Sequence, residues 1–311
     1  MGRTVWAWAA IACAGVFAQA LTQQPSPAED DINGLKRFEQ TQGLKPTGNF
    51  ERRSGQPAAS YRCYFTGKLE LPQTYDQLEL RQVKSQDKGQ ACGLDETRYD
   101  IFYYAIEAVA SGHTPVTENL EAAPIERVLM VIPHEDLHDS GALKDLPAAI
   151  GEAATTLMGF HTAAAYARER YGPDSPTYKN LSREAELFLR KSVIVNRYFD
   201  ELTALYAGVK EGRTPPGAAL AAKAEAFEQL RRECSAIRPA PTSFNACPAA
   251  VNNAGLAFDA TYTRYYPLLY RFYVSTGCDF AATLRALSPA ARGKAKSEAD
   301  IATYLEKLTA E

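Results

Sequence analysis

Residues 134–138 read His-Glu-Asp-Leu-His and supply the groups that a metal-dependent hydrolase needs. On a helix, the imidazoles of His134 and His138 lie one turn apart on the same face and can ligate one Zn²⁺ ion. Glu135, between them, is placed to act as a general base that takes a proton from water. The spacing therefore predicts a metallohydrolase centre. Since catalytic zinc has three protein ligands and an open position for water, a third ligand must lie elsewhere in the chain.

The best third ligand is Glu152, which follows His138 by fourteen residues. A short turn around Gly141 and Pro147 would let a second helix fold back on the first and bring this carboxylate to the metal. His161 is the rival, but it follows Glu152 by nine residues, about two and a half helical turns, which places the two on opposite sides of a helix. The sequence therefore predicts one zinc ion per chain, with ligands His134, His138 and Glu152.

The residues around the motif have more than one possible role, and the start of the motif helix has two possible positions. Asp136 and Asp139 could orient the imidazoles, although a surface carboxylate near a helix start is the commoner role. His113, in a turn-like segment, is expected to be solvated. Pro133 either begins the motif helix, whose positive end would then favour a neutral first imidazole, or kinks a longer helix that starts near Pro124.

The N-terminus has the features of a secretory signal peptide. Arg3 precedes an apolar stretch from Thr4 to Phe17, and Ala18-Gln19-Ala20 has the small-x-small pattern of a cleavage site. The apolar run is shorter than the roughly 20 residues that span a bilayer. We expect residues 1–20 to be removed and the mature protein to be exported, periplasmic or secreted, with no stable membrane span. Lipid attachment at Cys13 is a minor alternative.

Charge and cysteine content narrow the function further. The net charge of −3 comes without a clustered basic excess, which argues against nucleic acid as a partner. Export makes disulfides permissible. Pairing neighbours in sequence predicts Cys63 with Cys92 and Cys234 with Cys247, which leaves Cys278 over, although other pairings and buried thiols remain open.

The elements that must position these residues are mostly helical. Residues 21–34 are polar and turn-rich and are predicted to be a linker. Aromatic and β-branched residues alternate from residue 59 onward, which predicts a small β section over 59–92. Everything after about Asp95 is predicted to be helical. The expected helices beyond the motif are Leu146–Tyr171, Ser182–Ala207, Gly217–Ile237, Asn252–Ser275 and Ser297–Leu308. The predicted fold is mostly α (α+β), with one domain over residues 35–311.

Several sequence blocks resemble a bacterial family provisionally described as aminopeptidases, which are exported or membrane-associated zinc proteins of the glutamate-ligand, gluzincin-like type. The likeness covers roughly residues 125–285. It departs from the family at Asp136 and Asp139, where members usually carry a small or apolar residue and Gln, and the gap to the glutamate is one residue longer. After the motif, the matching blocks are Gly151-Glu152-Ala153, Leu202-Thr203-Ala204-Leu205-Tyr206-Ala207, Asn252-Asn253-Ala254-Gly255-Leu256 with Tyr262 and Pro267, and Gly277-Cys278-Asp279.

The resemblance implies a zinc aminopeptidase that hydrolyses peptide substrates. It implies that Tyr262, with Tyr266 as the next candidate, stabilises the tetrahedral oxyanion beside the general base Glu135. It also implies that Asn252 and Asn253 bind the substrate backbone, although a helix N-cap followed by a surface residue is the alternative for this pair. The alternative function is an exported helical binding or scaffold protein with an inactive or structural metal site. The sequence sets neither the oligomeric state nor the particular peptide.

Overall fold

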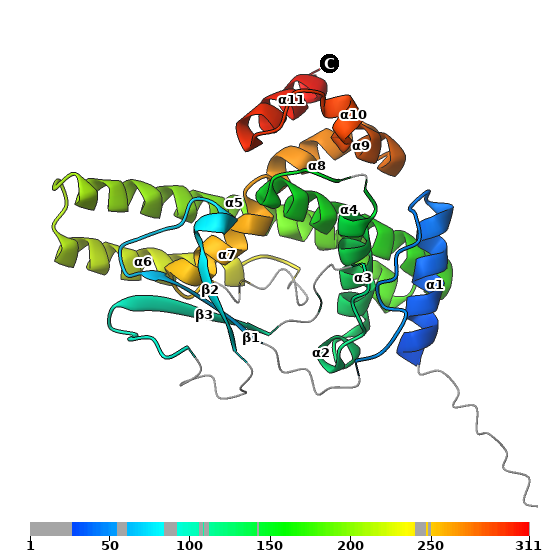
Figure 1. The fold of residues 1–311 in the computed structure, drawn as a ribbon, viewed down its shortest axis with the longest axis horizontal. Coiled ribbons are helices and arrows are strands. Elements are labelled where there is room, and N and C mark those ends of the chain that lie inside the picture. Colours follow the sequence, from blue (N-terminus) through cyan, green and yellow to red (C-terminus); the bar gives the residue numbers. More distant parts are fainter. Residues whose placement is uncertain are drawn as a thin grey trace, which may run out of the picture.

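The computed structural model describes residues 27–54, 61–83, 92–105, 108, 112–141, 143–239, 247 and 250–310. The predicted signal peptide and Cys13 lie outside these residues. Of the residues that the structure describes, 64% are helical and 7% lie in strands, which confirms the predicted fold class. Figure 1 shows one small sheet at the edge of a larger group of helices. The elements are α1 (Pro27–Thr41), β1 (Tyr61–Gly67), η1 (Tyr75–Gln77), β2 (Glu79–Val83), β3 (Tyr99–Ala105), α2 (Glu118–Glu121), α3 (Ile125–Asp139), α4 (Ala148–Tyr171), α5 (Pro176–Lys210), α6 (Pro216–Ser235), α7 (Asn253–Thr263), α8 (Tyr266–Ser275), α9 (Phe280–Leu287), α10 (Pro289–Arg292) and α11 (Glu298–Ala310).

The sheet is antiparallel, in the order β2-β1-β3, and one of its faces packs on α7. Tyr64 of β1 pairs with Phe102 of β3. Both rings contact Phe258 of α7, with centroid distances of 4.9 and 5.4 Å. The prediction that everything after Asp95 is helical is therefore wrong for β3. Its aromatic and β-branched residues suit a half-buried strand, and pairing with β1 satisfies its backbone.

The first helix corrects the predicted linker. The described part of residues 21–34, from Pro27 onward, belongs to α1. Acidic side chains in its first turn, Glu29 and Asp30, suit the positive end of a helix. Ile32 and Leu35 are buried in the main core. Packing of this apolar face outweighs the polar, turn-like composition from which a linker was predicted.

α3 carries the His-Glu motif and runs through Pro133, so the longer of the two predicted helices is present. It begins after Pro124, which places His134 well inside the helix. The positive end of the helix is therefore too far from His134 to favour a neutral imidazole there. Gly141, with φ of 74°, follows the end of α3 in the left-handed conformation that glycine adopts without strain. α4 then folds back against α3. A Cβ on Gly159 would lie 3.3 Å from the Met130 carbonyl oxygen, so this glycine permits the close approach.

The C-terminal half is built from helix pairs (Figure 1). α5 and α6 form a helical hairpin whose connecting turn projects away from α3 and α4. The single helix predicted over Asn252–Ser275 is two, α7 and α8, because Pro267, in the first turn of α8, has no backbone N–H with which to continue the hydrogen bonding of α7. Asn196 of α5 donates to the carbonyl oxygens of Thr263 and Arg264 at this break, at 2.9 and 3.3 Å.

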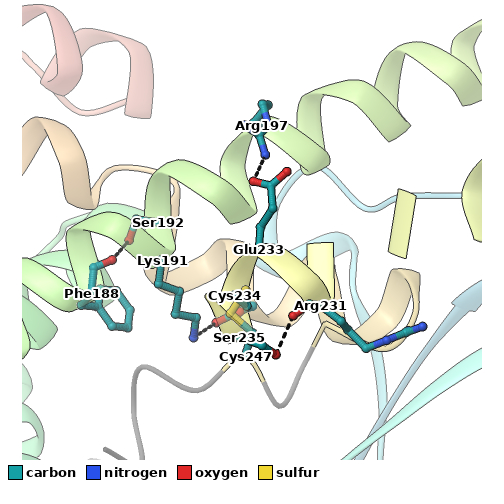
Figure 2. Close-up of a disulfide and its surroundings, with 10 residues drawn as sticks. Phe188, Lys191, Ser192, Arg197, Arg231, Glu233, Cys234, Ser235 and Cys247 are labelled. Carbon is teal, nitrogen blue, oxygen red and sulfur yellow. Dashed lines mark hydrogen bonds and ion pairs between the residues drawn. A yellow bond between two sulfur atoms is a disulfide. The ribbon is translucent and has the colours of Figure 1, made fainter. Parts of the chain in front are cut away.

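Both predicted disulfides are present. Cys63–Cys92 ties β1 to the segment before β3. Figure 2 shows Cys234, at the end of α6, bonded to Cys247, with the ion pair of Arg197 and Glu233 joining α5 to α6 nearby. Cys278 is exposed and unpaired among the cysteines that the structure describes. Within the described part of the chain, no helix has the length and apolar character needed to span a membrane.

Candidate metal centre

His134 and His138 of α3 and Glu152 of α4 form one compact group. The two Nε2 atoms are 3.3 Å apart. Oε2 of Glu152 lies 3.1 Å from Nε2 of His134 and 3.4 Å from Nε2 of His138. The turn at Gly141 and the packing of α4 on α3 create this arrangement, as the spacing predicted. The centre is a candidate metal-binding triad.

The triad fits a cation better than it fits a hydrogen-bonded cluster. Oε2 of Glu152 is buried and has no well-formed hydrogen bond within the described residues, although both imidazoles lie close to it. A buried carboxylate oxygen without a partner is costly. A metal ion at the centre of the three atoms would satisfy it. The side chains of His138 and Glu152 are 25% and 24% exposed, so solvent reaches one side of the group.

Two threonines of α4 lie beside the histidine ligands. Oγ1 of Thr155 lies 3.3 Å from Nε2 of His138, and Oγ1 of Thr156 lies 3.5 Å from Nδ1 of His134. The Thr156 contact is to the nitrogen that does not face the triad, so it can fix the rotation of the His134 ring, whereas the Thr155 hydroxyl lies beside the same Nε2 that would bind a metal. Neither residue was predicted from the sequence. Their positions three and four residues after Glu152, on the same helix face, were the available signal.

The charges at the centre are coupled. Burial alone would raise the pKa of Glu152, but the imidazoles of His134 and His138 outweigh it and hold this pKa well below its usual range. Burial alone would lower the pKa of His138, but the Glu152 carboxylate outweighs it, so this pKa is raised. The carboxylate is thus ionised, and protons compete with a metal for the His138 nitrogen.

The structure also brings Tyr262 and Glu135 to the centre. The Tyr262 ring, on α7, lies 6.3 Å from the His134 ring between centroids. Burial raises the pKa of Tyr262 well above 10, and the charges of Glu152 and Glu135 raise it further. Tyr262 is therefore a protonated hydrogen-bond donor. The Glu135 charge also raises the pKa of His138, so this carboxylate lies near His138.

Comparison with known proteins does not extend this picture. No family model, curated protein or solved structure matches the chain.

The asparagines of the family-like block have structural roles instead of the predicted substrate contacts. Asn252 caps α7 by accepting from the backbone N–H of Gly255 at 3.0 Å, and it donates to a carbonyl of β3. Asn253 is fully buried, donates to two carbonyls after β1, and accepts from the Tyr206 hydroxyl at 2.8 Å. Their side-chain groups are thus engaged by the protein, at the end of α7 remote from Tyr262. The N-cap alternative holds for Asn252, whereas Asn253 is a core residue and not a surface one.

Tyr266 is also a structural residue. Its side chain is fully buried, and its hydroxyl donates to the carbonyl oxygen of Ala185 in α5 at 3.0 Å. Its ring packs on Phe188 at 4.6 Å between centroids. Of the two tyrosines considered for the oxyanion, Tyr262 is therefore the one near the triad.

Asp136 and Asp139, the two aspartates next to the histidine ligands in sequence, form hydrogen bonds and an ion pair with residues other than the imidazoles. Asp136 is buried and pairs with Lys36 of α1 at 2.8 Å, and it also accepts from the hydroxyl of Thr47. The expected surface role is therefore wrong for Asp136, which joins α1 to the ligand helix. Asp139 accepts from the Asn49 side chain at 2.7 Å and from a backbone N–H at 2.8 Å.

The remaining histidines lie outside the triad. His161 stacks on Tyr273 at 4.3 Å between centroids and lines a separate cavity of about 790 Å³. Its Nε2 is buried without a hydrogen-bond partner in the described residues, and burial lowers its pKa to about 4. His113 is exposed, as predicted. The geometry therefore supports Glu152, and not His161, as the third ligand.

Proposed function

We propose that this protein is an exported zinc metallopeptidase, with the aminopeptidase activity that the sequence resemblance implies. The observation that carries the proposal is the spacing of the three donor atoms. In tetrahedral zinc sites, N and O ligands lie about 2.0–2.1 Å from the metal, so their mutual distances are about 3.3–3.4 Å. The three distances of 3.1, 3.3 and 3.4 Å match this triangle closely. Two histidines and one glutamate are also a donor set typical of zinc proteases.

Zinc held there would polarise the carbonyl group of the scissile amide and lower the pKa of a water molecule toward about 7. Glu135 then takes a proton from the attacking water and transfers it to the leaving amine. Tyr262 donates its hydroxyl hydrogen to the oxyanion that develops on the substrate, and the raised pKa of this tyrosine keeps that hydrogen in place. Thr156 contacts Nδ1 of His134, the nitrogen that does not ligate, and holds this imidazole in its ligating orientation.

Export is the second part of the proposal. Two disulfides favour an oxidising compartment. The apolar N-terminal stretch with its small-x-small site would direct the chain there and then be removed. The mature enzyme would act on peptides in the periplasm or outside the cell.

The proposal is tested with Glu135→Gln, measured on a panel of fluorogenic peptide amides and by zinc analysis. Glu126→Gln, which changes a glutamate on the same helix where it accepts from Asn180 at 3.0 Å, is the matched control. Loss of the general base should reduce kcat by about 10²–10⁴ and leave the zinc content intact. The control should keep its activity. A zinc-loaded wild type without peptidase activity would favour a structural metal in a binding or scaffold protein. A Glu135→Gln variant with full activity would exclude Glu135 as the general base.

A further inference from the structure

Arg62 of β1 is a half-buried cation whose partners, in the part of the chain that the structure describes, are tyrosines and no carboxylate. Its Nη1 donates to the Tyr75 hydroxyl at 3.4 Å, and that hydroxyl lies 3.2 Å from the hydroxyl of Tyr64. Its Nε is buried and has no hydrogen-bond partner in this part of the chain. Leaving a guanidinium desolvated with only neutral partners costs free energy. An anion that fitted beside it would remove this cost.

The position of Arg62 relates it to the candidate metal centre. It pairs with Tyr104 across β1 and β3, and side chains two residues apart on a strand share a face, so Arg62 and Tyr64 both face α7. The Tyr104 ring lies 4.9 Å from the ring of Phe258 in α7. One turn further along α7, Tyr262 lies 5.4 Å from Phe258 and faces His134. Arg62 thus lies on the face of the sheet that packs on α7, and the same helix carries Tyr262 beside the metal-binding triad.

The guanidinium keeps its charge in this environment. Burial by itself would lower the pKa of Arg62, but the neighbouring oxygens of Tyr64, Tyr75 and Tyr262 outweigh it, and the pKa is raised. A planar guanidinium with free donors matches a carboxylate in two parallel hydrogen bonds, which makes arginine the usual partner of that group.

We propose that Arg62 binds a carboxylate of the substrate, so that the centre acts on peptides with a negative charge close to the scissile bond. The inference rests on the proposed peptidase function and adds a substrate class to it. The carboxylate comes either from a free C-terminus, as in a short peptide, or from an acidic side chain. The hydroxyl of Tyr75 orients the guanidinium toward it.

Binding of three tripeptides to zinc-loaded Glu135→Gln protein tests the proposal by isothermal titration calorimetry, because this background does not consume the probes. The probes are Ala-Ala-Ala, its C-terminal amide, and Ala-Glu-Ala amide. We expect at least one charged probe to bind about tenfold or more tighter than the neutral amide, and Arg62→Gln to abolish that preference. The charged probe that is preferred identifies the source of the carboxylate.

Two further variants serve as controls. Arg81→Gln removes an exposed arginine of the same sheet, whose side chain contacts Phe65, and should leave the preference unchanged. Arg62→Lys keeps the charge but not the planar donor pair, so it should retain part of the preference even if Arg62→Gln does not fold. Equal binding of all three probes, or a full preference that persists in Arg62→Gln, would overturn the proposal.

The outcome separates this inference from the proposed function. If the protein hydrolyses no peptide but shows an Arg62-dependent binding preference, the carboxylate site is supported and the peptidase function is refuted. If the protein hydrolyses charged and neutral peptides equally well, and Arg62→Gln loses no activity, the peptidase function is supported and the carboxylate site is refuted.

Discussion

His161 should make the protein less stable as the pH falls below about 6.5. Its imidazole stacks on Tyr273, and its Nε2 is buried without a hydrogen-bond partner in the described residues. Burial lowers the pKa of His161 from 6.5 to about 4, because the charged form would lose its hydration. The unfolded chain, in contrast, binds a proton at the ordinary histidine pKa.

The direction and size of this change in the free energy of unfolding follow from the difference in protons bound by the folded and unfolded states. Between pH 6.5 and 4 the unfolded state binds more protons than the folded state, so the free energy of unfolding decreases as the pH falls through this window. Above pH 6.5 the contribution is fully present, and below pH 4 it is lost. Each pKa unit corresponds to about 1.4 kcal/mol, so the change between pH 7 and pH 4.5 is roughly 2 to 2.5 kcal/mol.

Urea denaturation at pH 7 and pH 4.5 measures this contribution. His161→Phe keeps an aromatic ring against Tyr273 but cannot titrate, so the loss of stability on acidification should be smaller in this variant by roughly 2 kcal/mol. His113→Gln removes an exposed histidine and should follow the wild type. Identical losses in wild type and His161→Phe would refute the reasoning.

Three further predictions concern stability and catalysis. Replacing Cys63 and Cys92 by Ser opens a bridge with a sequence separation of 29 and should lower the free energy of unfolding by about 3 to 4 kcal/mol, from the entropy that the unfolded chain regains; an unchanged urea midpoint would contradict this. Asp259→Ala removes the buried carboxylate 2.7 Å from Lys191 and should cost about 3 to 5 kcal/mol in the same assay, of which a second change, Lys191→Met, should restore part. Tyr262→Phe should reduce kcat by about 10²-fold or more and leave the zinc content unchanged, whereas an unaffected kcat would exclude Tyr262 from oxyanion stabilisation.

The metal-binding triad was accessible from sequence because it depends on local geometry. His134 and His138 need only a helix, and Glu152 needs only a helical hairpin whose turn is marked by Gly141. The cysteine pairing was accessible for a similar reason, since neighbours in sequence formed both bridges.

Long-range packing was not accessible in the same way. Arg62 lies on the face of the sheet that packs on α7, the helix that carries Tyr262, and this packing includes β3, a strand that was not predicted from the sequence. Asn253 was predicted to contact substrate from a block resemblance, whereas its hydrogen bonds to the β1 end and Tyr206 could be found only in three dimensions. A polar side chain in a motif has the same appearance in sequence whether it faces solvent or closes a buried network.

The central claim is that His134, His138 and Glu152 bind zinc together. Elemental mass spectrometry of the purified protein tests it most directly, beside Glu152→Ala and, as a control, Glu169→Ala, which changes an exposed glutamate of the same helix. We predict near one zinc per chain in the wild type and the control, and a sharp decrease in Glu152→Ala. Wild-type protein that holds no zinc even after reconstitution, or Glu152→Ala protein that holds as much as the wild type, would contradict the assigned centre.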